Sequence, residues 1–239
     1  MKESSFEALR LIADHTKTFS FPNLSRPSVP PKQPATRELV NWGAQVYCFS
    51  WLLHLSALLN GLLTLDDAGN RPSAIILARS AYELGAHAYY VKKHLKQHID
   101  AKNYDAAWKF LLAITTGSRY MTEQFPSTGE MFPTAAHISK MIKAFGEVMP
   151  EDAIENYSFL SEFSHPNSFT FGQHHDWLTP YEVSFVPQKA SGMFGATAAA
   201  CIQGLMAIQQ LLVLTDEEPA ATELHQLLVD LVEGKGAAG

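Results

Sequence analysis

The stretch "LVNWGAQVYCFSWLLHLSALLNGLLTL", residues 39–65, decides the fold class. No charged residue occurs in it between Glu38 and Asp66, and its apolar residues recur at the spacing of a helix rather than of a strand. Thr36 precedes it, a residue type that favours the N-cap position, and "DDAGN" follows it as a typical helix end. The pattern therefore predicts one long apolar helix through about Leu65.

A second uncharged stretch lies between Lys189 and Asp216. Each stretch is long enough to cross about 30 Å of hydrocarbon as a helix. Polar side chains interrupt both of them: Gln45, His54, Ser56, Asn60, Gln203, Gln209 and Gln210. Helices that are apolar all round also form the centres of soluble bundles. We therefore interpret both stretches as buried central helices, with His54 as a hydrogen-bonded core histidine, and keep a membrane span as the alternative.

The rest of the chain is also mostly helical in its periodicity. Further helices are predicted over about 6–17, 70–98, 103–125, 134–148, 151–164, 191–214 and 220–232. Asn70 is the expected N-cap of the second of these. Alternation of apolar and polar residues near 168–188 predicts a small extended segment or hairpin. The prediction is a single all-α domain over 1–239, with an N-terminal helix and proline-rich connector in 1–35 and a flexible tail at 234–239.

Charge and cysteine content restrict the function. The formal net charge of −6 and pI near 5.9 disfavour a broad nucleic-acid-binding surface, although a local basic patch stays open. Cys48 and Cys201 both lie in apolar runs, which indicates buried cysteines in a reducing compartment. Residues 1–17 lack the apolar core of a secretory signal. We expect a cytoplasmic protein without a membrane partner.

One helix carries an unusual polar face. Arg79, Glu83, His87, His94 and His98 fall in one narrow sector at 100° per residue. The first two are i, i+4 partners inside an otherwise apolar segment. Such a pair is either a matched buried ion pair that orients two helices or part of a cleft, and the pattern alone favours neither.

His94 and His98 have the spacing by which one helix presents two imidazoles to a metal ion. Three lysines surround them: Lys92, Lys93 and Lys96. Because like charge discourages a cation, we expect a solvated helix face, no metal and no cofactor. The alternative metal site needs a third ligand from a distant part of the chain, with three candidates: His165, His174 and His175.

A second polar line occurs in "YSFLSEFSHPNSFT", residues 157–170. Tyr157, Ser161 and His165 lie one helical turn apart on one face, and Pro166 ends the helix. The last-turn carbonyls favour a protonated imidazole at His165. The hypothesis is that these side chains meet Arg79 and Glu83 across a contact between two helices.

The segments "RSAYE" and "YSFLSEFSHPN" resemble the motifs of a group of uncharacterised bacterial helical proteins, similar to the wider HEPN-type bundles. The motifs are Arg-x-x-x-Glu and Tyr-x-x-Leu-Ser-x-x-x-His, and the resemblance covers about residues 71–167. It implies six site residues: Arg79, Glu83, Tyr157, Leu160, Ser161 and His165. HEPN ribonucleases place an Arg four to six residues before their His. This chain has no Arg after Arg119, so Arg79 would have to take that place from another helix.

The resemblance implies a bacterial defence or toxin–antitoxin protein, dimeric or otherwise homo-oligomeric, that acts on RNA or a nucleotide, with catalytic activity either retained or lost. In that interpretation His165 is the general acid or base and Arg79 stabilises negative charge on phosphate. Tyr157 and Ser161 orient the substrate, and Glu83 holds Arg79. The alternative is a non-catalytic dimerisation or interaction protein in which the same residues form an internal structural cluster.

Overall fold

The computed structural model describes residues 2–28, 33–115, 137–149, 152–162, 175–179, 182–185 and 193–234. The elements are α1 (Lys2–Thr18), α2 (Arg37–Asp67), α3 (Arg71–Asp100), α4 (Tyr104–Thr115), α5 (Ile138–Phe145), α6 (Ala153–Glu162), β1 (His175–Thr179), β2 (Glu182–Phe185), α8 (Met193–Leu214) and α9 (Glu218–Glu233). The predicted all-α bundle with a small hairpin is confirmed.

The starts of α2 and α3 differ in how they are capped. Thr36 accepts a 3.3 Å hydrogen bond from the Leu39 amide, as its N-cap position predicts. Asn70 occupies the N-cap position of α3, but its side chain makes no cap hydrogen bond. Its backbone, at φ −91° and ψ 63°, lies outside the extended region from which a cap side chain reaches the first helical amides. Gly69, at φ +75°, makes the turn between these helices.

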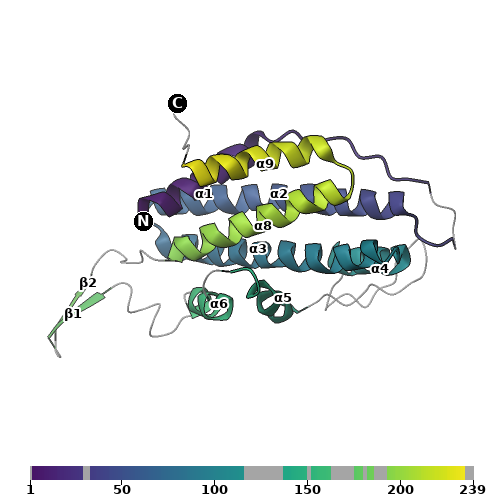
Figure 1. Cartoon of the computed structure of the whole chain (residues 1–239). Helices are drawn as coiled ribbons and strands as arrows, with labels where there is room; N and C mark the ends of the chain where they lie inside the picture. The colour runs from purple at the N-terminus through teal and green to yellow at the C-terminus, as the bar shows by residue number, and fades with distance from the viewer. Residues whose placement is uncertain are drawn as a thin grey trace.

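The bundle is built around α3, which packs against α2, α8, α4, α5 and α6. In Figure 1, α5 and α6 lie on the side of α3 away from α1 and α9. Two glycines allow the close packing of α3 and α8. A Cβ on Gly85 would lie 2.3 Å from the Ala200 carbonyl oxygen, and one on Gly204 would lie 3.0 Å from the Cα of Gly85.

The two uncharged stretches form α2 and α8, and both contribute to the main hydrophobic core. Cys48 and Cys201 are fully buried, as predicted. Both helices are long and apolar enough to cross a membrane, but a core helix passes the same test. The interpretation of His54 as a core residue is wrong. It lies beside Leu53, which is 55% exposed, on a face of α2 that the described residues leave open to solvent.

The hairpin predicted near 168–188 is present as β1 and β2. The strands pair antiparallel, with His175 opposite Phe185 and Trp177 opposite Val183. Other predicted parts lie outside the residues that the structure describes: the remainder of the 168–188 segment, helix residues 116–125 and tail residues 235–239.

Candidate functional site

The candidate site begins with an ion pair on the surface of α3. Arg79 Nε donates a 3.0 Å hydrogen bond to Glu83 Oε1, one helical turn further along. Their side chains retain 26% and 30% of their surface exposed. The pair therefore lies neither in the core nor fully in solvent.

Tyr157 of α6 completes this cluster. Arg79 Nη2 donates a 3.0 Å hydrogen bond to the Tyr157 hydroxyl, and the guanidinium carbon lies 5.3 Å from the centre of the phenol ring. Both contacts favour the charged guanidinium. Two segments that are 78 positions apart thus meet as the motif pattern predicts. We use "Arg79 cluster" below for Arg79, Glu83 and Tyr157.

Two further contacts position α6. The fully buried Tyr82 donates through its hydroxyl to the Ala153 carbonyl at 3.1 Å, which fixes the start of α6 against α3. Asp152 Oδ1 accepts from the amides of Ile154 and Glu155 at 2.8 and 3.0 Å, as an N-cap residue does. These contacts hold Tyr157, one turn along α6, within reach of Arg79.

The structure joins three of the six site residues that the resemblance implies, Arg79, Glu83 and Tyr157. Ser161 lies on the same helix, but its hydroxyl donates to the Tyr157 carbonyl at 2.8 Å, so it bonds to its own helix backbone. Leu160, carried by the same motif, is buried and packs in the small core between α3, α5 and α6. His165 lies outside the described residues, three positions beyond the end of α6.

The electrostatics of the Arg79 cluster keep the guanidinium charged. Burial by itself lowers the pKa of Arg79. The hydrogen bond to Tyr157 and the charge of Glu83 outweigh burial and raise that pKa above its ordinary value. Arg79 Nη1 makes no hydrogen bond to any described residue, so the cation keeps donors with which to bind an anion.

His87 belongs to a different contact, although it shares the polar sector of α3. Its Nδ1 lies 2.7 Å from the hydroxyl of Tyr47 on α2. Burial lowers the pKa of His87 to about 4, so the imidazole is neutral at pH 7. In the tautomer with the proton on Nε2, the Tyr47 hydroxyl donates to Nδ1. The pair joins α2 to α3 inside the bundle.

His94 and His98 lie further along α3 and pack on the aromatic ring of Phe110, with ring centres at 5.8 and 6.0 Å. Burial and the Lys93 charge lower the pKa of His94. No group of three metal-binding side chains occurs among the described residues. The proposed third ligands lie elsewhere: His175 in β1, and His165 and His174 outside the described ranges.

Two polar features near the site do not follow from the sequence pattern. Glu147, just beyond α5, accepts hydrogen bonds from Lys93 and Tyr89 of α3, which lowers the pKa of its carboxyl. Asn156, next to Tyr157, has a buried side-chain nitrogen that makes no hydrogen bond to any residue the structure describes. Glu147 lies far along the chain from Lys93 and Tyr89, and no spacing rule connects them. Burial of the Asn156 side chain likewise depends on how α6 packs, so both features are seen only in the structure.

No protein-family model, curated protein sequence or solved structure matches this chain.

Proposed function

We propose that this protein is a HEPN-like helical bundle of a bacterial defence or toxin–antitoxin system, and that the Arg79 cluster binds the phosphate of RNA or of a nucleotide. The observation that carries the proposal is the partly exposed guanidinium of Arg79. Glu83 and Tyr157 hold it in place, and it keeps N–H donors that are not used in these two contacts. A guanidinium with free donors binds phosphate oxygens strongly.

Basic residues also occur elsewhere on the same group of helices: Lys92, Lys93 and Lys96 of α3, and Lys140 and Lys143 of α5. Lys92 lies about 20 Å beyond Arg79 along α3. Lys93 and Lys96 are paired with Glu147 and Asp100. The proposal therefore rests on Arg79 itself and not on a surrounding basic surface.

In this proposal the residues have distinct roles. Arg79 stabilises the negative charge that develops on phosphorus-bound oxygens, and Tyr157 orients the substrate. His165 follows α6 and transfers the proton as general acid or base. Glu83 positions Arg79. We also propose that the protein is a cytoplasmic homo-oligomer.

Two contacts support a second function. Ser161 bonds to its own helix and Glu83 neutralises Arg79, as they would in a structural connection between α3 and α6. This arrangement favours a non-catalytic interaction protein. In that case the cluster fixes the position of α6 and binds no phosphate.

The test is RNA cleavage and nucleotide binding by the full chain and three variants, Arg79→Ala, Tyr157→Phe and His165→Ala. Arg10→Ala is the matched control, because Arg10 is also paired to a carboxylate but lies on α1. The proposal expects binding to fall about tenfold or more in Arg79→Ala, as for a lost charged hydrogen bond. The control should bind like the wild type.

Cleavage, if the activity is retained, should disappear in His165→Ala while binding persists. Wild-type protein that neither binds nor cleaves RNA or nucleotides, with variants that change only the unfolding free energy, would support the structural alternative instead.

A further inference from the structure

Two hydrophobic clusters form the interior of the described part of the chain, and α5 and α6 belong to the smaller one. The main core holds 36 buried residues, drawn mainly from α1, α2, α3, α4, α8 and α9. The second cluster holds 11, and it includes every buried residue of α5 and α6. One face of α3 supplies the other side of this cluster, and α8 adds a single buried residue, Ala200. The α5–α6 pair is therefore attached to the bundle mainly through α3.

Neither α5 nor α6 is long enough to be a stable helix without this packing. α5 has 8 residues and α6 has 10, whereas an isolated helix shorter than about 12–15 residues is marginal in water. The two helices pack on α3 and on each other, and no other described helix makes an extensive contact with either. Loss of the contact with α3 should therefore unfold both helices together, while the main core keeps the other helices packed.

Three tyrosines make polar links between α3 and this pair. Tyr82 donates to the Ala153 carbonyl at 3.1 Å, and Tyr89 donates to Glu147 Oε2 at 3.0 Å. The third link is the hydrogen bond to the tyrosine of the Arg79 cluster. Glu147 keeps 50% of its side-chain surface exposed, and the Arg79 cluster is also partly exposed. Charged contacts at such positions add only modestly to stability, because solvent screens them.

We propose that α5 and α6 open from α3 as one unit while the rest of the bundle stays folded, and that this opening controls the phosphate site. The opening separates Tyr157 from Arg79, so the Arg79 cluster exists only in the closed form. A phosphate held by both residues binds the closed form more tightly and shifts the equilibrium toward it. This control rests on the phosphate function proposed above, whereas the opening follows from the packing alone.

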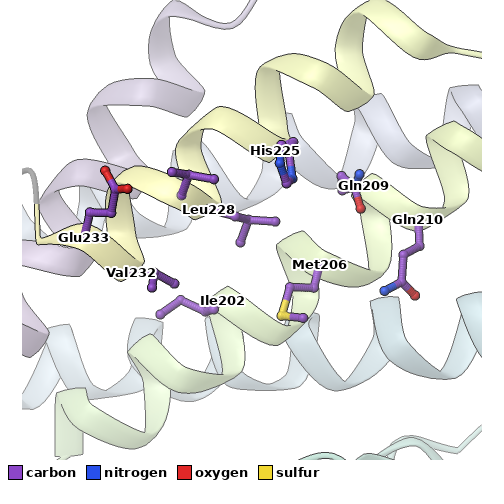
Figure 2. Close-up of a pocket in the computed structure, with 9 residues that line it drawn as sticks. Ile202, Met206, Gln209, Gln210, His225, Leu228, Val232 and Glu233 are labelled. Atoms are coloured by element: carbon purple, nitrogen blue, oxygen red, sulfur yellow. The ribbon is translucent and has the colours of Figure 1, made fainter.

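The helix α9 is the matched comparison, because it also lies on the outside of the bundle. Figure 2 shows the open groove between α8 and α9, with Ile202 and Met206 on one side and Leu228 and Val232 on the other. Other side chains of α9 belong to the main core, among them the fully buried Leu224. A difference between α9 and the α5–α6 pair therefore reports attachment to the main core and not position at the surface.

Hydrogen exchange of the full chain, followed by mass spectrometry at low urea concentrations, measures the opening. The amides of residues 138–145 and 153–162 should exchange at least about tenfold faster than those of α2, of α8 and of residues 221–228 in α9. The exchange of α5 and of α6 should also depend on urea concentration with the same slope, because one opening exposes both helices.

Two tyrosine variants test whether the helices open as one unit. Tyr157→Phe removes a hydrogen bond of α6, and Tyr89→Phe removes one just beyond the end of α5, while both variants keep the aromatic ring. Each should speed exchange in both helices about fivefold, which is the effect of one lost hydrogen bond. Arg10→Ala is the control, since it breaks an ion pair between α1 and α2 and should leave the exchange of α5 and α6 unchanged.

Inorganic phosphate tests the control of the site. At a concentration about ten times its Kd, it should slow the exchange of α5 and α6 in the wild type about tenfold, as for a ligand that binds only the closed form. The same concentration should have no effect on these helices in Arg79→Ala. Sodium chloride at equal ionic strength should have no effect in either protein.

Exchange of α5 and α6 at the rate of α2 and α8, or equally fast exchange of residues 221–228, would overturn the opening. So would a tyrosine variant that speeds only one of the two helices. Phosphate that binds the wild type in calorimetry without slowing this exchange would overturn the control of the site alone. Phosphate that does not bind at all would overturn the proposed function and the control with it, while the opening would still stand on the exchange rates.

Discussion

Arg79 Nη2 donates a 3.0 Å hydrogen bond to the hydroxyl of Tyr157, which lies 78 positions further along the chain. The bond joins α3, the central helix of the bundle, to the short helix α6. Neither residue is fully buried, so the contact holds two helices together while both side chains keep part of their surface exposed.

The free energy of this contact can be measured by a double-mutant cycle. Tyr157→Phe should reduce the free energy of unfolding by about 1 kcal/mol, since one hydrogen bond is lost. The coupling energy with Arg79→Ala should be roughly 1 kcal/mol, small because solvent screens a partly exposed pair. Urea denaturation of the wild type, both single variants and the double variant gives the value. Additive effects would contradict the geometry.

Gly85 should tolerate no side chain. Gly85→Ala would place Cβ 2.3 Å from the Ala200 carbonyl oxygen of α8, so the two helices must separate. We expect a loss of about 3 kcal/mol in unfolding free energy, at the upper end for an overpacked core.

Gly195→Ala is the matched control, a glycine of α8 whose Cβ would have only ordinary contact, 3.6 Å from Ser5 Oγ. Because alanine favours a helix over glycine, this variant should gain about 0.5–1 kcal/mol. Thermal denaturation of both variants compares them directly. Equal melting temperatures would mean that the close approach of α3 and α8 is not required.

Acid should destabilise the fold through His87. Its imidazole has an ordinary pKa of 6.5, which describes the unfolded chain, and burial lowers the pKa to about 4 in the fold. The unfolded state therefore binds a proton more readily. The free energy of unfolding is unaffected by His87 above pH 6.5 and falls by about 3 kcal/mol as the pH decreases from 6.5 to 4.

Urea denaturation between pH 7 and pH 4 checks this prediction. His87→Gln keeps a hydrogen-bonding side chain for Tyr47 but has no proton to bind, so its stability should depend less on pH over that range. His54→Gln, at an exposed histidine of α2, is the control and should follow the wild type. A variant His87→Gln that loses stability as steeply as the wild type would show that another group causes the acid sensitivity.

The purified protein should contain no stoichiometric zinc or iron. His94 and His98 pack on Phe110, and the positive charge of Lys93 disfavours a cation there. Elemental analysis of the full chain measures the content. A content of about one metal ion per chain, lost in His94→Ala, would contradict this expectation and imply a third ligand.

The sequence by itself determined the helical architecture. The uncharged, helically periodic stretch at 39–65 and the similar one before Asp216 became α2 and α8, and Thr36 begins α2 as its type predicts. The ion pair of Arg79 and Glu83 was also predictable from the sequence, because i, i+4 spacing on a helix brings two side chains together whatever surrounds them. Helical periodicity and N-capping depend only on residues that are neighbours in the sequence, so they can be predicted from the sequence alone.

The tertiary structure decided which side chain each helix face meets. His54 and His87 both lie on apolar helices. Only the packing of α3 against α2 buries His87 beside Tyr47, whereas His54 faces solvent. Ser161 shares a helix face with Tyr157, yet it bonds to its own backbone. The angle and separation of two helices depend on the side chains and glycines of both, and no local pattern in either helix contains that information.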